Sequence, residues 1–198
     1  AQVTLASLAG NRYAAPFRDT VTAWAGRLSA VAETMERWLA VQAMWTAMEA
    51  VFAGGDIVKQ LPAEASRFAG IDRSFSKAVA HARDARSVLA ACVGSDLLAG
   101  ALPALADQLE LCQKSLAAYL DRKRAAFPRL YFVSDPTLLE ILSLGSDPAA
   151  VVPHFQAGLF DSLAGVAFDK GCATRITDMV SAQGERVKLD KPVDATGE

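Results

Sequence analysis

The segment from Pro16 to Phe52 constrains the fold most, because it contains no further proline and spaces its large apolar side chains by alternating threes and fours. This spacing is typical of a heptad seam along one long helix that packs against other helices. Pro16 suits a first helical position, and Gly54-Gly55 suits the stop. At about 1.5 Å rise per residue, the helix would extend roughly 50 Å. The seam comprises Val21, Trp24, Leu28, Val31, Met35, Trp38, Trp45 and Phe52, with Gln42 and Glu49 in its polar positions.

The three tryptophans, Trp24, Trp38 and Trp45, suggest either a ligand-binding cluster or a packed core. Because all three fall within the seam, core packing is the stronger interpretation. An exposed groove that binds a partner helix stays open as the alternative.

Further helices are predicted from their start signals and apolar rows. Pro62 opens a second helix, and Asp72 is the expected cap of a third. A strongly patterned helix is expected beyond Pro103 and ends at Phe127-Pro128. Its expected inner row is Leu105, Leu109, Cys112, Leu116, Tyr119, Leu120 and Lys123.

The charge run Asp121-Arg122-Lys123-Arg124 closes that helix. Cations in a last turn favour the negative end of the helix dipole, so we expect a solvated helix end. A phosphate-binding or microtubule-binding patch is the alternative.

Residues 130–133 are apolar and bounded by prolines, which predicts a buried strand or extended link. Asp135-Pro136 and Asp147-Pro148 each combine a capping residue with a proline at the first helical position. Beyond them, β-branched content replaces the helical period. Strands are expected at residues 164–168, 174–181 and 186–189, with Ala182-Gln183-Gly184-Glu185 as a hairpin turn.

Composition excludes several classes of protein. The chain has 198 residues, 52% of them hydrophobic, which is enough for a core without disulfides. Lys plus Arg number 20 against 22 Asp plus Glu, so neither nucleic acid nor a membrane is expected as partner. Three cysteines without CxxC spacing indicate a reducing compartment. With no leader or membrane-spanning run, we expect a soluble piece of a longer protein.

Motifs that carry chemistry are missing from the sequence. Neither GxxxxGK[ST] nor GxGxxG occurs, and no serine lies in a GxSxG frame. His81, expected to be solvated, and His154, expected to pack with a hydrogen-bonded tip, have no ligand-spaced partner. Asp107 and Glu110 are spaced as on any solvated helix face. We therefore predict no catalytic, cofactor-binding or metal-binding residue, although a hydrolase assembled from distant carboxylates stays open.

A resemblance to a known family is carried by an ordered series of short motifs. Residues 38–52, WLAVQAMWTAMEAVF, resemble the opening of the dynein linker region. Next come DI at 56–57, QLP at 60–62, Glu64, RF at 67–68 and ID at 71–72. The strongest match runs through QKSL, YL and KR to FPRLYFVSD at 127–135 and LLEILS at 138–143. Asp147-Pro148, Val152-Pro153-His154, Leu159-Phe160, MVS at 179–181, Gly184-Glu185 and Val187 continue it.

The chain is therefore similar to the linker of dynein heavy chains over residues 38–198. Met48, Asp121 and Leu130 depart from the family pattern but keep size and polarity. Details such as Gln60-Leu61-Pro62 and Leu159-Phe160-Asp161 resemble axonemal rather than cytoplasmic dyneins. Residues before Trp38 match less well and form either the start of the linker or the last helix of the tail.

The resemblance implies a mainly α fold, an elongated helical bundle with a small β-hairpin near the C-terminus. We expect a helix at 1–37, a helical linker subdomain at 38–162 and a strand segment at 163–198. The implied function is a lever arm without cofactors, coupling ATP and Mg²⁺ chemistry in the parent's AAA+ ring to force along microtubules. The ring, microtubules and light, intermediate or docking chains are implied partners, and the axoneme the implied location. A helical adaptor binding a partner helix or accessory chain is the alternative.

Overall fold

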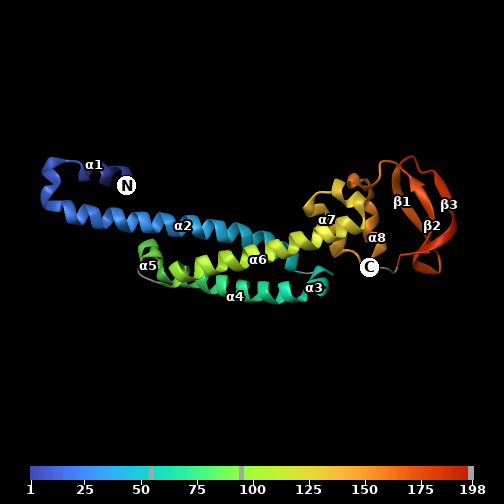
Figure 1. Ribbon diagram of the computed structural model, residues 1–198, viewed down its shortest axis with the longest axis horizontal. Helices are drawn as coiled ribbons and strands as arrows, with labels where there is room; N and C mark the ends of the chain where they lie inside the picture. Colours follow the sequence, from blue (N-terminus) through green and yellow to red (C-terminus); the bar gives the residue numbers. More distant parts are fainter. Residues whose placement is uncertain (54–55, 94–95, 196–198) are drawn as a thin grey trace. The chain divides into compact units, whose positions relative to one another are not determined.

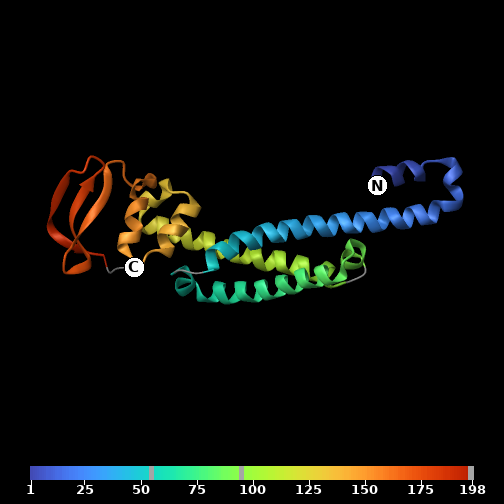
Figure 2. The ribbon, with the colours of Figure 1, turned by 180° about the vertical axis from the view of Figure 1, so that it is seen from behind.

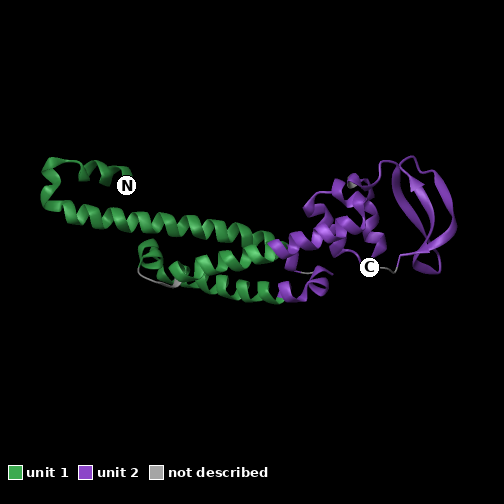
Figure 3. Cartoon of the chain, in the orientation of Figure 1, with its two compact units in different colours: residues 1–50, 66–113 green, residues 51–65, 114–198 purple. Residues whose placement is uncertain are grey.

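The computed structural model describes residues 1–53, 56–93 and 96–195. Helices dominate it, and a small antiparallel sheet follows them, which confirms the predicted mainly α class. The chain divides into two compact units (Figure 3). Unit 1 comprises Ala1–Ala50 and Ser66–Gln113, and unit 2 comprises Val51–Ala65 and Lys114–Glu198. The division at residues 37 and 162 stays a prediction.

The helical elements follow one another along the chain (Figures 1 and 2). They are α1 (Gln2–Ala9), η1 (Arg12–Phe17), α2 (Arg18–Phe52), α3 (Ile57–Gln60), α4 (Pro62–Ala85), α5 (Val88–Cys92), α6 (Asp96–Ala126), η2 (Pro128–Phe132), α7 (Asp135–Ser143), α8 (Pro148–Val151), η3 (Val152–His154) and η4 (Phe155–Leu159). Within the described residues, none of these helices has both the length and the apolar content to cross a bilayer.

Helix α2 confirms the predicted long helix, although Pro16 lies in the preceding 3-10 turn instead of opening α2. The expected stop at Gly54-Gly55 lies outside the described residues. In unit 1, α2 packs beside α4 and α6. The core of this unit consists of Val21, Val41, Met48, Phe68, Ile71, Phe75, Ala78, Ala91, Cys92, Leu98, Leu102, Leu105, Leu109 and Cys112.

Two predicted helix starts are wrong. Helix α4 runs unbroken through Asp72, which therefore caps nothing. Its carboxylate instead accepts a hydrogen bond from the indole of Trp45, 3.2 Å away. Helix α6 begins at Asp96 and includes Pro103 at its eighth position, where the proline is exposed and the lost N–H bond is tolerated.

Unit 2 holds shorter elements around its own core of Ile57, Leu61, Leu116, Tyr119, Leu120, Leu130, Val133, Leu138, Ile141 and Leu159. The predicted strand at residues 130–133 is wrong, because Pro128 opens the 3-10 turn η2. Leu130 and Val133 are buried, but Phe132 is 79% exposed. Asp147 caps α8 as predicted, whereas the cap of α7 is Ser134 and not Asp135.

The sheet has the order β1-β2-β3, from Leu163–Asp169, Cys172–Ser181 and Arg186–Asp194. The predicted hairpin turn is confirmed: Gly184 has φ +85°, and its N–H donates to the carbonyl of Ser181 at 3.0 Å. Only a residue without a Cβ adopts this φ at low cost. The strand expected at residues 164–168 is observed as β1, and it pairs with β2 so that the hairpin becomes a three-stranded sheet.

Candidate functional site

An aromatic cluster joins α2 to α4 in unit 1. The rings of Trp38 and Trp45 lie 5.8 and 5.2 Å from the ring of Phe75, which is buried. The indole N–H of Trp38 donates to Gln42 at 3.1 Å, as the indole of Trp45 does to Asp72. Each half-buried indole therefore packs its ring against Phe75, while its N–H donates a hydrogen bond to a polar side chain.

The row of α2 that faces the core is rotated around the helix axis from most of the predicted seam. Helix α2 buries Val21 of the predicted seam and, at intervals of seven residues, Thr34, Val41 and Met48, which lie outside it. Trp24 and Met35 are 41% and 42% exposed, so the prediction that all three tryptophans pack in a core is wrong for Trp24. A heptad row predicts an apolar stripe, but not which edge of the stripe faces the neighbouring helices.

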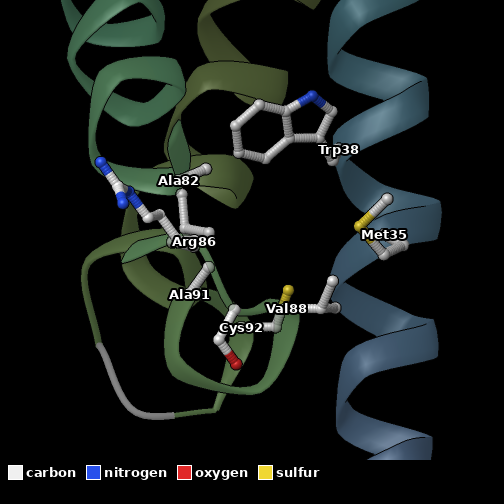
Figure 4. A pocket seen from close by; sticks show the side chains of 9 residues that line it. Met35, Trp38, Ala82, Arg86, Val88, Ala91 and Cys92 are labelled. Carbon is white, nitrogen blue, oxygen red and sulfur yellow. The ribbon is translucent and has the colours of Figure 1, made fainter. Parts of the chain in front are cut away.

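A hollow of about 330 Å³ lies beside Trp38 (Figure 4). Met35 and Trp38 project into it from α2, opposite the end of α4 and the short helix α5. The other lining residues are Ala82, Arg86, Ser87, Val88, Ala91, Cys92 and Leu98. A second hollow of about 460 Å³ adjoins Trp38, Gln42, Trp45, Phe75, Ser76, Val79, Ala80 and Arg83. Both hollows lie within unit 1 and share Trp38.

Arg124 forms a clamp at the end of α6. Its guanidinium donates to the carbonyls of Leu130 and Val133, at 3.4 and 3.1 Å, and to the carboxylate of Asp135. The side chain is only 14% exposed. The prediction of a solvated helix end is therefore wrong for Arg124, although Asp121 and Arg122 are exposed. The clamp fixes the corner between α6, η2 and α7, because a planar guanidinium holds several acceptors in one geometry.

Asp56 closes a second corner of unit 2, between α3 and the end of α7. Its carboxylate binds Lys59 at 2.8 Å and accepts the backbone N–H of Ser146 at 2.9 Å. These hydrogen bonds, that from Lys59 first, lower the pKa of Asp56 to about 2. Ser146, next to Gly145, is therefore anchored to the residue that precedes α3.

A third contact requires glycine. Gly158 has φ +104°, and a Cβ there would lie 2.8 Å from the carbonyl oxygen of Phe132. Arg129, from the same turn as Phe132, donates to the carbonyl of Leu159 at 2.8 Å. Its guanidinium also lies 5.0 Å from the ring centre of Phe160. The turn η2 is thus held against η4 by a close backbone approach and by one arginine.

The sheet presents different faces to the helices and to its surroundings. A Cβ on Gly165 would meet Val152 at 3.5 Å, so that face of β1 points toward η3. Strand neighbours alternate, which directs Val166 to the other face. Cross-strand pairing extends this face in the row Val166–Met179–Val187, and beyond the register shift after Ala167 a second row pairs Phe168, Ile176 and Val193. Met179, Val187 and Val193 are 40%, 50% and 54% exposed.

The histidines differ in their surroundings. The Nε2 atom of His81 is buried, and no described residue forms a hydrogen bond with it, so the expectation of a solvated His81 is wrong. His154 is half-buried, with its Nε2 3.9 Å from a carboxylate oxygen of Glu140. Asp107 and Glu110 lie on the exposed side of α6, as expected. In the described ranges, no three His, Cys, Asp or Glu side chains converge as a metal site would require.

Two thiols differ in their surroundings. Burial raises the pKa of the Cys92 thiol. A hydrogen bond with Thr174, at 3.3 Å, lowers the pKa of the Cys172 thiol. The absence of catalytic, cofactor and metal residues stays a prediction.

Sequence analysis missed Asp56, Asp72 and Arg124 as residues that fix the geometry. The available signal was position: Arg124 closes a helix just before a proline turn, and Asp56 follows the double glycine. Together with the aromatic cluster, these residues can hold the elements within each unit at fixed angles.

Comparison with known proteins gives the whole chain one kind of relative. The family model described as dynein heavy chain, N-terminal region 2, matches residues 1–198. The dynein gamma chain, flagellar outer arm, of Chlamydomonas reinhardtii is 57% identical over 196 residues, 99% of this chain and 4% of the relative. Dynein axonemal heavy chain 8 of Mus musculus is 46% identical over 195 residues, 98% of this chain and 4% of the relative. The chain thus spans about 4% of the length of these relatives.

Proposed function

This chain belongs to the dynein heavy chain family, as its N-terminal region 2, and from that premise we propose that it is a segment of the linker, the lever arm of the motor. In this role it couples ATP hydrolysis elsewhere in the heavy chain to force along microtubules. The chemistry belongs to the parent's AAA+ ring, where ATP and Mg²⁺ bind, and this segment transmits the resulting movement. The parent is accordingly a microtubule motor ATPase.

The observation that carries the proposal is the clamp at Arg124. A lever transmits displacement only if its elements keep their angles, and a buried guanidinium with several acceptors resists rotation at a corner. The corners at Asp56 and Gly158 act in the same sense. Packed helices supply stiffness between the corners, because the i to i−4 bonds and the seam oppose bending.

The proposed setting is the axoneme of a cilium or flagellum. The names of the relatives, a flagellar outer arm chain and an axonemal heavy chain, support it. The AAA+ ring of the same heavy chain is the proposed mechanical partner, with microtubules reached through the parent motor. Light, intermediate or docking chains are further proposed partners.

We also propose that the C-terminal hairpin, residues 174–189, lies near a hinge or a ring contact. The outward apolar rows of the sheet support this, because rows of half-exposed valine and methionine gain stability when another surface covers them. Deleting residues 174–189 from the heavy chain should reduce ATP-coupled linker displacement. Unchanged displacement would remove this part of the proposal.

The lever role is tested in the full heavy chain with Arg124→Ala and the neighbouring control Arg122→Ala. ATP turnover and microtubule gliding are measured together. A softened corner should lower the gliding velocity while ATP turnover stays near that of the wild type. Arg122→Ala should change neither quantity, since Arg122 is exposed and lies outside the clamp. Equal loss of turnover and gliding in Arg124→Ala would contradict a purely mechanical role.

A further inference from the structure

The apolar stripe of α2 is wider than the core of unit 1 can cover. Thr34, Val41 and Met48 face the core, while Trp38 lies about a sixth of a turn and Met35 about a third of a turn around the helix, toward α4. The sequence places both residues in one heptad seam, yet Met35 is 42% exposed. The described residues of unit 1 therefore cover this part of the seam only partly, above all at Met35.

The uncovered part of the stripe forms one wall of a groove. The hollows of about 330 and 460 Å³ follow each other along α2 and meet at Trp38. The facing wall of the groove is α4, which contributes Ser76, Val79 and Arg83, and the wall continues to Arg86, just after α4 ends at Ala85. Figure 4 shows Trp38 and Met35 directed from α2 across the first hollow. This groove, between residues 35–45 of α2 and residues 76–86, which comprise the end of α4 and the residue after it, is called the α2–α4 groove below.

The rim of the α2–α4 groove combines apolar and basic side chains. Val79 is 42% exposed and Val88 57%, so large apolar side chains lie at its mouth. Arg83 is paired with Asp84 at 3.4 Å, but no carboxylate of the described residues forms an ion pair with Arg86. Arg86 also has φ +53°, a backbone conformation that non-glycine residues seldom adopt. The groove thus offers apolar hollows beside one unneutralised guanidinium.

We propose that the α2–α4 groove binds an amphipathic helix of the same heavy chain, from a segment outside residues 1–198. Met35 to Gln42 spans two helical turns, about 10 Å, which matches apolar side chains seven residues apart on a bound helix. A carboxylate beside one of these anchors complements Arg86. Since the chain spans about 4% of the length of its relatives, most of the parent polypeptide is available for such a contact. Tethering in one polypeptide raises the effective concentration of the bound helix.

The proposal is tested by photo-cross-linking in the full heavy chain. A benzoylphenylalanine at Val79 lies in the α2–α4 groove, and the same probe at Ala47 lies on the exposed far side of α2. After illumination, mass spectrometry identifies the linked peptide. The expected product from position 79 is an intramolecular link to a helical segment outside residues 1–198 with apolar residues seven apart and a neighbouring Asp or Glu. Position 47 should give no link to that segment.

A charge reversal makes the result specific. Arg86→Glu should lower the yield of the cross-link about threefold or more, whereas Arg122→Glu should leave it unchanged. Unaltered hydrogen exchange in α2 and α4 would show that Arg86→Glu keeps the bundle folded. The proposal is overturned by a link from position 79 to a different polypeptide, by the absence of any link, or by a yield that does not respond to Arg86→Glu. The lever role does not depend on this groove, so these outcomes leave the coupling of ATP turnover to gliding as a separate question.

Discussion

The bundle of unit 1 and the short elements of unit 2 are held together by different means. In unit 1, long helices interlock through apolar side chains, with Phe75 between two indoles as the main example. In unit 2, the chain changes direction repeatedly, and each corner carries a charged or backbone contact, at Arg124, Asp56 or Gly158. Regularly spaced apolar side chains are enough to pack long helices side by side. A change of chain direction also requires a residue that fixes the angle between two elements. The two units should therefore fail under different substitutions.

Phe75→Ala should have the largest effect and should be confined to unit 1. Removing a buried phenylalanine leaves a cavity between the two indoles and destabilises the bundle by about 3–5 kcal/mol. Hydrogen exchange measures the opening free energy of each unit separately. Val79→Ala, at a 42% exposed position of the same helix, should cost less than about 1 kcal/mol. Equal loss of protection in both units would erase the proposed difference.

Arg124→Ala should act on unit 2 alone, with a loss of about 2–3 kcal/mol, because two carbonyls and a carboxylate lose a charged donor. Hydrogen exchange at α7 should report the loss. Arg124→Lys should recover little of it, since an ammonium lacks the planar fork. Arg122→Ala should stay within about 0.5 kcal/mol of the wild type. Full rescue by lysine would show that charge alone holds the corner.

Gly158→Ala and Gly100→Ala should change the free energy of unfolding in opposite directions. The first introduces a Cβ 2.8 Å from a carbonyl at φ +104° and should destabilise unit 2 by about 2 kcal/mol. The second lies in α6 with nothing within 4 Å and should stabilise that helix by about 0.5–1 kcal/mol. Chemical denaturation, monitored by hydrogen exchange, measures both changes in the free energy of unfolding. A change in the same direction for the two substitutions would refute the contrast between the long helices and the corners of the chain.

Acid should weaken the Asp56 corner slightly. The folded pKa of about 2 lies below the ordinary value of 3.8, so Asp56 binds a proton more readily when unfolded. Its contribution to stability is therefore complete above about pH 4 and is lost as the pH falls toward 2. Hydrogen exchange at α3 should accelerate over this window in the wild type and less in Asp56→Asn. An identical pH profile in both proteins would contradict the role of the carboxylate.

Sequence signals between near neighbours predicted the long helix and the turns of this chain well. Uninterrupted apolar spacing predicted α2, Asp147-Pro148 predicted the start of α8, and Gly184 predicted the hairpin turn. Each depends on neighbours a few residues away. The family resemblance, carried by residues 38–198, was confirmed over the whole chain.

Contacts between distant residues explain the errors. Arg124 suits a solvated helix end by every local rule, and only folding brings the carbonyls of η2 within reach. Asp72 has the chemistry of a cap, yet a tryptophan 27 residues earlier binds its carboxylate. The seam of α2 predicted a helix face, but the position of α4 decides that Met35 lies outside the core. Tertiary partners therefore determine the roles of these three residues.

The central claim, that this segment moves as a passive lever, is tested most directly by distance measurement in the working heavy chain. A donor fluorophore at exposed Glu49 and an acceptor on the AAA+ ring would report their separation as nucleotide turns over. We predict two distinct transfer efficiencies that alternate with the nucleotide state, with the Arg124→Ala variant showing a broadened distribution. A single transfer efficiency, unchanged between ATP-bound and nucleotide-free motor, would contradict the lever role.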